Sequence, residues 1–181
     1  MGMALSVSKY SVADLDLLPD DGNRYEILAG MLIVTPLPGS GHQGIATRLS
    51  VLFAQHLLAR RLQFYSPGAV KLPPFTQLEP DFLVLPHHFV PGIEWEDVTE
   101  NWLAVEVLSP SSRVYDREFK RDAYIALGVR EVWLVDIRNR SIEVCVKRGA
   151  GQIVRDAIEW RSPDRELSVR VDLNWLFEDM L

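Results

Sequence analysis

Apolar residues recur along the chain with two different periods, and each period predicts a different kind of element. Strand-like runs at 24–28 and 31–34 flank a turn that contains Gly30. This arrangement predicts a β-hairpin, because glycine readily adopts the positive φ of a tight turn. A capping-box sequence begins at Ser40 and is followed by apolar residues at helical spacing. We therefore expect a long helix over about 41–61.

The rest of the chain predicts a mixed β-sheet. The expected strands at 63–72 and 80–85 are separated by a short turn, which favours antiparallel pairing between them. A helix over about 115–127, stopped by Gly128, separates the third and fourth strands and favours a parallel crossover between them. The apolar runs place the expected strands at 63–72, 80–85, 102–108, 131–136, 141–147, 152–160 and 167–171.

Shorter helices are expected near both ends of the chain. A capping box at Ser11 predicts a helix that ends near Pro19. Asp172 is expected to cap a last helix that carries Trp175 and Phe177 into the core. Together these elements predict an α/β fold of the α+β type, in which helices flank a mixed sheet with an N-terminal hairpin and a C-terminal β extension.

Composition and charge narrow the class of protein. With 181 residues, 48% of them hydrophobic and 24% charged, the chain suits a single globular domain over 1–181. No apolar run approaches the ~20 residues of a membrane span, and the first residues lack the pattern of a signal peptide. The one cysteine, Cys145, is interpreted as a buried apolar residue, so we expect a cytoplasmic protein. The net charge of −6 argues against a strong general DNA binder.

Two acidic residues are candidates for a metal site. Glu106 interrupts the otherwise apolar strand over 102–108, where a carboxylate needs a cation, hydrogen bonds or a metal. The alternative is a strand-end glutamate that reaches water or Arg121. Asp81 begins another apolar strand, with the capping of a turn as its alternative role. If the two strands are neighbours, both carboxylates converge at one end of the sheet and suit Mg²⁺.

Further candidates lie on the two long helices. Asp116, Lys120 and Tyr124 are spaced four residues apart and share one face of the helix that follows Glu106. Lys120 would orient a water molecule that the metal activates to attack a phosphorus atom. Alternatively, Lys120 belongs to a solvated ladder of salt bridges. Asp116 and Tyr124 would support the site, with core packing as the alternative for the tyrosine. His42, in the first turn of the other helix, would contact phosphate or the metal's surroundings, or else would have a structural or capping role.

Four strings in the sequence resemble the Uma-two family. They are RYEILAGMLIV, PDFLVL, VEVLSPSSRVYD and FKRDAYIALGVREVWLVD, and the resemblance runs in order over about 10–146. Its most specific part is VEVLSPS followed at the right interval by GVREVWLVD. The Uma-two family is grouped with the PD-(D/E)XK nucleases. The resemblance therefore implies a restriction-endonuclease-like fold, with its core over about 24–146, and metal-dependent cleavage of nucleic acid.

The resemblance also assigns roles to individual residues. Asp81 matches the aspartate of the family's proline-aspartate motif, and Glu106 matches the glutamate of the next motif. Glu26, within RYEILAG, matches an upstream acidic position and would add a metal ligand or fix the site. The usual lysine of the superfamily lies two positions beyond the second acidic residue, where this chain has Leu108. The resemblance implies that the lysine has moved to the following helix, at Lys120.

Two main hypotheses of function follow. The first is an endonuclease that depends on Mg²⁺ or Mn²⁺ and cuts DNA rather than RNA, in which Asp81, Glu106 and Glu26 bind the metal and Lys120 assists the nucleophilic water. The second is a catalytically inactive module on the same fold that binds nucleic acid or a protein partner. Hydrolysis of another phosphoester is a third possibility. By analogy with the superfamily we expect a homodimer, because a duplex takes two cuts. We expect no membrane partner, because no apolar run is long enough to span a bilayer.

Overall fold

A six-stranded mixed sheet forms the centre of the computed structural model, which describes residues 9–57, 63–109 and 116–180. Its strands are β3 (Gln63–Tyr65), β6 (Phe82–Leu85), β7 (Asn101–Val107), β8 (Val129–Asp136), β9 (Ser141–Cys145) and β10 (Gln152–Val154). They lie in the order β10-β9-β8-β7-β6-β3. The β7–β8 pair is parallel and the other neighbours are antiparallel. The antiparallel pairing of β3 with β6 and the parallel crossover are therefore confirmed.

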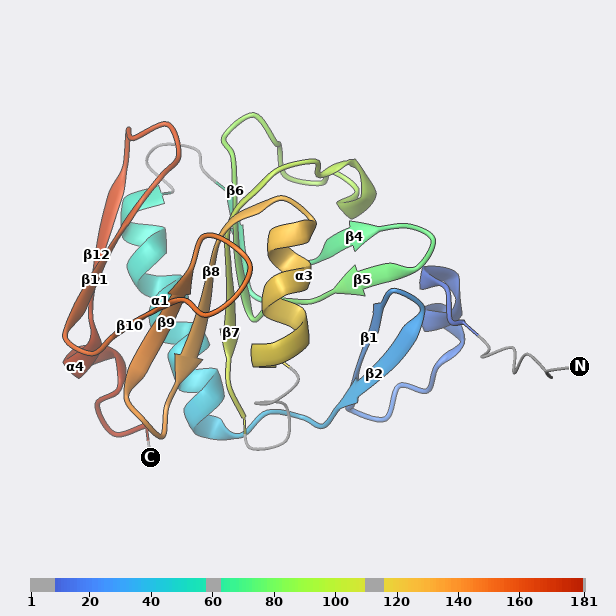
Figure 1. Cartoon of the computed structure of the whole chain (residues 1–181), viewed down its shortest axis with the longest axis horizontal. Coiled ribbons are helices and arrows are strands. Elements are labelled where there is room, and N and C mark those ends of the chain that lie inside the picture. Colours follow the sequence, from blue (N-terminus) through green and yellow to red (C-terminus); the bar gives the residue numbers. More distant parts are fainter. Residues whose placement is uncertain (1–8, 58–62, 110–115, 181) are drawn as a thin grey trace, which may run out of the picture.

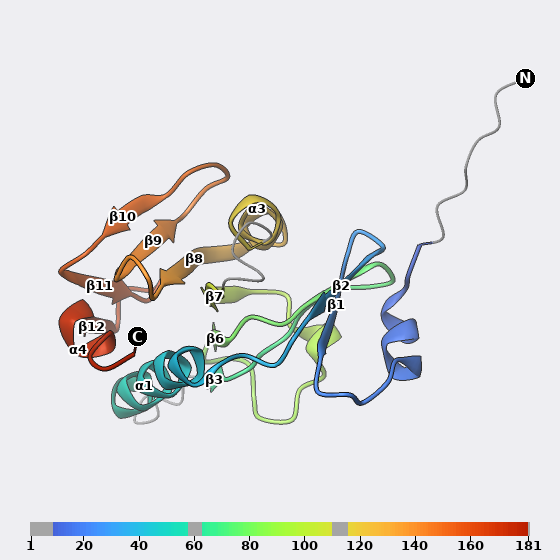
Figure 2. The same ribbon diagram turned by 90° about the horizontal axis from the view of Figure 1, so that it is seen from below.

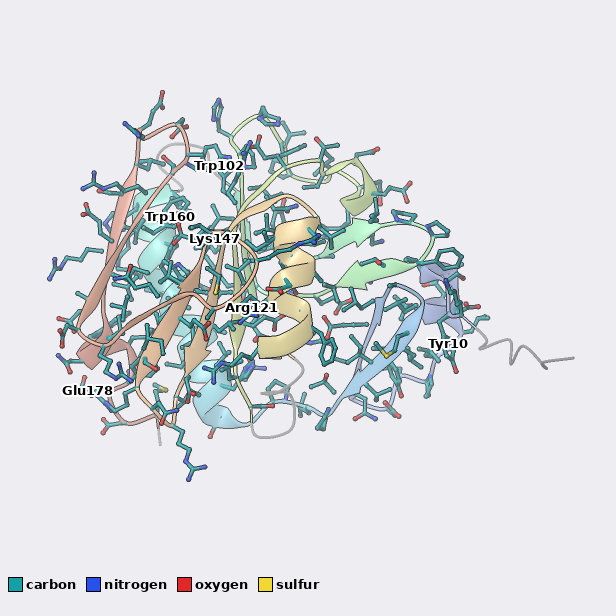
Figure 3. All side chains as sticks on the ribbon, in the orientation of Figure 1. Tyr10, Trp102, Arg121, Lys147, Trp160 and Glu178 are labelled. Atoms are coloured by element: carbon teal, nitrogen blue, oxygen red, sulfur yellow. The ribbon has the colours of Figure 1, made fainter. Side chains whose placement is uncertain are left out.

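Helices cover both faces of this sheet, as Figures 1 and 2 show. One face carries α1 (Ser40–Leu57), the hairpin of β11 (Ala157–Arg161) and β12 (Ser168–Asp172), and the short helix α4 (Leu173–Leu176). The other face carries the π-helical turn η4 (Asp116–Lys120) and α3 (Arg121–Ala126). The ring of Phe53 from α1 lies 5.0 Å from that of Phe82 and 5.5 Å from that of Trp160, between centroids. The larger apolar core therefore lies under α1, where Trp160 is buried (Figure 3).

A second, smaller sheet stands beside the central one (Figure 1). Its strands are β1 (Arg24–Leu28), β2 (Met31–Thr35), β4 (Val70–Leu72) and β5 (Thr76–Leu78), in the order β2-β1-β5-β4. Ala29 and Gly30 join β1 to β2 with φ values of 52° and 86°. Positive φ at both central residues matches the twist of the flanking strands. The predicted hairpin is thus confirmed.

Two of the predicted strands are each divided in two. The run over 63–72 breaks into β3 and β4, which belong to different sheets. Pro67 lacks an N–H for a ladder, and a Cβ at Gly68 would lie 2.6 Å from Cβ of Leu83. The run over 152–160 likewise breaks into β10 and β11. The strand β5 was not predicted, because it has only three residues and lies between prolines.

The helices differ from expectation mainly at their ends. The helix predicted over 115–127 begins with the π-helical turn η4 and ends as expected before Gly128, whose φ is 88°. The predicted end of the long helix, 58–61, lies outside the described residues. The N-terminal helix is the 3-10 helix η1 (Val12–Leu17), and it begins with the predicted capping box at Ser11.

The remaining helical turns are short. The loop before β7 contains the 3-10 turn η3 (Trp95–Asp97). Asp172 caps α4 as predicted, because its Oδ1 accepts a hydrogen bond of 2.8 Å from the N–H of Asn174. Phe177 enters the core, but Trp175 is 39% exposed, since it lies on the outer side of this short turn. In the described part of the chain, each helix is too short or too polar to cross a membrane.

Candidate active site

Asp81 and Glu106 face each other across two neighbouring strands. β6 and β7 are antiparallel with Phe82 opposite Val105, so the register continued by one residue sets Asp81 opposite Glu106. Oδ2 of Asp81 accepts a hydrogen bond of 2.8 Å from the N–H of Val107. The two acidic residues are 4% and 2% exposed. The structure therefore brings the two carboxylates together at one end of the sheet, as the sequence predicts.

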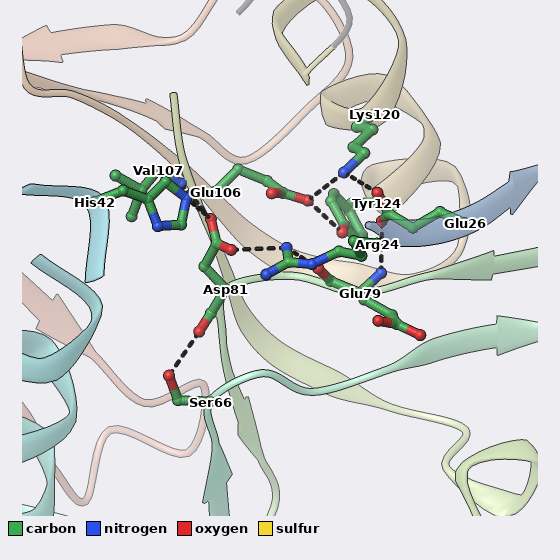
Figure 4. A network of polar contacts seen from close by, with 10 residues as sticks. All are labelled: Arg24, Glu26, His42, Ser66, Glu79, Asp81, Glu106, Val107, Lys120 and Tyr124. Atoms are coloured by element: carbon green, nitrogen blue, oxygen red, sulfur yellow. Dashed lines mark hydrogen bonds and ion pairs between the residues drawn. The ribbon is translucent and has the colours of Figure 1, made fainter. Parts of the chain in front are cut away.

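A buried lysine bridges two of the site's carboxylates (Figure 4). Nζ of Lys120 lies 2.6 Å from Oε2 of Glu26 and 3.3 Å from Oε1 of Glu106. The hydroxyl of Tyr124 donates a hydrogen bond of 2.6 Å to the same Oε1. Lys120 ends the π-helical turn and Tyr124 lies in α3, so both side chains leave one helical face. Such π turns recur at functional sites in proteins.

Glu26 holds the lysine from the N-terminal sheet. It lies on β1 and is fully buried. Its Oε1 accepts a hydrogen bond of 2.7 Å from the N–H of Glu79, and its Oε2 pairs with Lys120. Burial raises the pKa of Glu26, although the charge of Lys120 opposes this shift. Both oxygens of Glu26 are therefore engaged by donors from the chain itself.

Two basic side chains pair with Asp81. Nη1 of Arg24 lies 2.8 Å from Oδ1 of Asp81, and Nε2 of His42 lies 3.0 Å from its Oδ2. Burial favours the protonated form of Asp81, but the hydrogen bond and charge of His42 and the charge of Arg24 outweigh it and hold the pKa of Asp81 below its usual value. Burial also favours a neutral Arg24, yet the surrounding carboxylates raise its pKa, so the guanidinium stays charged.

The turn that carries His42 lies beneath the last residues of the chain. A Cβ at Gly41 would lie 2.5 Å from the carbonyl oxygen of Met180, and a Cβ at Gly44 would lie 2.5 Å from its Sδ. Arg48, further along α1, donates hydrogen bonds to backbone carbonyls in and after α4. Glycine at these two positions therefore allows the C-terminal turn to pack against the helix that positions His42.

The acidic side chains suit a hard divalent cation that takes few protein ligands. Mg²⁺ commonly binds one or two carboxylates and completes its shell with water and substrate phosphate oxygens. Asp81 and Glu106 offer such a pair. Within the described ranges, no group of three or more His, Cys, Asp or Glu side chains is arranged to hold a metal ion. The fit to Mg²⁺ rests on the carboxylates of Asp81 and Glu106 alone, with water and phosphate oxygens to complete the ion's shell.

Comparison with known families identifies the chain. The model of the Uma2 family, described as "Putative restriction endonuclease", matches residues 12–176. This chain belongs to the Uma2 family. The crystal structure of "a putative nuclease belonging to DUF820" from Anabaena variabilis superposes with a TM-score of 0.73 at 17% identity, covering 94% of this chain and 99% of that chain. No curated protein matches the sequence.

Membership of Uma2 confirms the resemblance found in the sequence, and the superposition confirms the predicted fold. The family groups this protein with restriction-endonuclease-like nucleases, which act on nucleic acid and generally use divalent metals. The Anabaena protein shares the architecture over 94% of this chain, and at 17% identity the similarity shows the fold alone.

The candidate site contains most of the predicted residues and one that was missed. The four residues predicted to act directly lie in one network, and His42 and Tyr124 each contact it (Figure 4). The side chain of Asp116 lies outside the described part of the structure. Arg24 was not singled out, because a charged residue at a strand end is usually solvated. Its signal was the two-residue period of the strand, which puts Arg24 and Glu26 on one face.

Proposed function

We propose that this Uma2 protein is a Mg²⁺-dependent endonuclease that hydrolyses phosphodiester bonds of DNA. The observation that carries this proposal is Lys120, which is 3% exposed and is held between two carboxylates, with Asp81 facing one of them. Burying so many charges is costly for a folded protein. Clusters of this kind are concentrated at sites that must handle charge during a reaction.

Asp81 and Glu106 are the proposed ligands of the metal. A divalent cation bound there would activate a water molecule and neutralise charge on the phosphate. Glu26 points both oxygens at donors of the chain, so we assign it the task of holding Lys120 in position. Tyr124 fixes Oε1 of Glu106 and thereby keeps this carboxylate turned toward the site.

Lys120 is proposed to act on the attacking water and the phosphate. Its ammonium group lies beside Glu106, so water or phosphate oxygen held at that carboxylate meets a positively charged donor. A hydrogen bond from the ammonium orients the lone pair of the water and offsets the negative charge that grows on the phosphate. In this way Lys120, which lies on the helix, would supply the positively charged donor that the superfamily's lysine supplies from the strand.

A catalytically inactive module on the same fold is the second candidate. It is favoured by the pairing of every carboxylate of the site with a basic side chain: Asp81 with Arg24 and His42, and the two glutamates with Lys120. In this case the cluster would stabilise a surface that binds nucleic acid or a protein. The net charge of −6 also favours a partner other than bare DNA.

Charge-removing variants of the two proposed ligands test the nuclease. Asp81→Asn and Glu106→Gln keep the shape of each side chain, and cleavage of a supercoiled plasmid with Mg²⁺ should fall at least ~100-fold in either variant. Glu159→Gln, which changes a carboxylate that is 46% exposed on β11, is the matched control and should cleave normally. Circular dichroism checks that each variant is folded.

The outcome separates the two candidates. Full cleavage by either ligand variant contradicts the proposed site. Wild-type protein that cleaves neither DNA nor RNA with Mg²⁺ or Mn²⁺, and that binds neither ion in calorimetry, supports the inactive module.

We also propose that the protein forms a homodimer, since a duplex takes two cuts. Sedimentation equilibrium measures the mass of the assembly and tests this proposal. A cytoplasmic location stays a prediction.

A further inference from the structure

Arg24 sets a permanent positive charge beside Asp81, one of the two proposed ligands of the metal ion. Its Nη1 lies 2.8 Å from Oδ1 of Asp81 and also donates to the carbonyl of Glu79 at 3.2 Å. A guanidinium keeps its charge at any pH at which proteins fold. The negative charges of Glu106 and Glu26 act on this group as well, so Arg24 offsets part of the negative charge of the whole cluster.

The other donors to Asp81 are less able to move. Oδ2 accepts from the backbone N–H of Val107, which is fixed in β7, and faces His42, whose side chain is 11% exposed. The side chain of Arg24 is 22% exposed, so it has a path to solvent. A cation that binds Oδ1 would meet the guanidinium on the same atom, and two positive charges at such a separation repel each other. Of the three donors to Asp81, Arg24 is therefore the one with the most room to move away.

We propose that Arg24 occupies the metal position on Asp81 in the metal-free protein, and that binding of a divalent cation displaces it. This inference rests on the proposed metal site of Asp81 and Glu106. Arg24 keeps a buried carboxylate paired while the cation is absent, which a carboxylate in the core requires. The same contact lowers the affinity of the site for metal, so Arg24 sets the cation concentration at which the site fills.

Calorimetric titration with Mn²⁺ alone tests this competition. Arg24→Gln removes the competing charge, so its dissociation constant for Mn²⁺ should be ~10-fold lower than that of the wild type, or ~1.4 kcal/mol. Arg24→Lys keeps a charge and should stay closer to the wild type. Arg130→Gln is the matched control, because it removes an arginine that is 63% exposed and pairs with Glu100 far from the cluster. Its Mn²⁺ affinity should not change.

A second measurement follows the arginine itself in the wild-type protein. The guanidinium NMR signals of Arg24, identified by their loss in Arg24→Lys, should move toward those of exposed arginines when Mg²⁺ is added. Signals that stay unchanged at saturating Mg²⁺ overturn the displacement.

Two calorimetric results also decide against it. Mn²⁺ binding by folded Arg24→Gln that is equal to or weaker than wild type overturns the inference and leaves the metal site standing. Absence of Mn²⁺ binding in both proteins overturns the inference together with the proposed nuclease.

Discussion

Lys120 is 3% exposed and Glu26 is fully buried, and each is tolerated in the core because the other is there. Removing two charges from water costs more than their attraction returns unless hydrogen bonds complete the site. The N–H of Glu79 supplies one such bond to Glu26, and the hydroxyl of Tyr124 supplies another to Glu106. The buried network formed by these side chains is thus stable only when all of its members are present.

Removing one charge of the Glu26–Lys120 pair should therefore lower the free energy of unfolding by much more than half of the loss that follows removal of both charges. Glu26→Gln or Lys120→Met leaves an uncompensated buried charge, and each should lower the free energy of unfolding by ~3 kcal/mol. The double variant should lose clearly less than the sum. Urea denaturation followed by tryptophan fluorescence gives all four values, and additive losses would contradict the interpretation.

At the scale of elements, the N-terminal turn of α1 depends on close backbone packing. A Cβ at Gly41 would lie 2.5 Å from the carbonyl oxygen of Met180, which is a backbone atom that cannot rotate away. Gly39, just before the helix, has open space around it, with nothing within 4 Å of an added Cβ. Alanine at Gly41 would therefore clash with the backbone of Met180, whereas alanine at Gly39 would not clash.

Gly41→Ala should destabilise the protein although alanine favours a helix by ~1 kcal/mol over glycine. The clash with Met180 should outweigh this gain and lower the free energy of unfolding by ~1–2 kcal/mol. Gly39→Ala should stay within ~0.5 kcal/mol of wild type. Urea denaturation of the three proteins side by side provides the comparison. A Gly41→Ala protein as stable as wild type would show that the C-terminal turn is not held against α1.

The sequence predicts those elements whose signals are local. Gly30 marks the first hairpin, Gly128 ends the helix that crosses over between β7 and β8, and Asp172 caps α4. Pro67 and Gly68 signal a break within 63–72, but the assignment of β3 and β4 to different sheets could not be predicted, because only the tertiary structure decides it. The π-helical turn before Lys120 has no sequence signal of its own.

The candidate site was predictable where a residue breaks a pattern. Glu106 is conspicuous as a carboxylate in an apolar strand, and register then brings Asp81 beside it. His42 was a candidate from its place in the first turn of a helix, whereas Arg24 was not, since charged residues are common at strand ends. The contacts of both residues with Asp81 connect segments far apart in the chain, so these contacts became visible only with the fold.

At the scale of the whole molecule, net charge and proposed substrate oppose each other. The chain carries a net charge of −6, with a pI of about 5.2, while DNA is a dense polyanion. A divalent cation in the site would reverse the local charge that an approaching phosphate meets. Binding of DNA should therefore depend on the cation more strongly than in a basic nuclease.

Fluorescence anisotropy with a labelled duplex measures this dependence. Replacing EDTA with Ca²⁺, a divalent cation that also takes oxygen ligands, should strengthen DNA binding at least ~10-fold, because metal bound at the carboxylates would contact the phosphate. The Asp81→Asn/Glu106→Gln double variant should lack this increase, and Glu159→Gln should keep it. Equal affinity of the wild type in EDTA and Ca²⁺ would show that the cation plays no part in holding DNA.

The packing of Met180 on the start of α1 also has a practical consequence for handling the protein. A fluorescent label or other bulky group attached at Met180 would lie beside the helical turn that carries His42. Tyr10, at the other end of the described chain, lies on the outer side of the small sheet, away from α1 (Figure 3). A label attached at Tyr10 would therefore stay clear of the helical turn that a label at Met180 would meet.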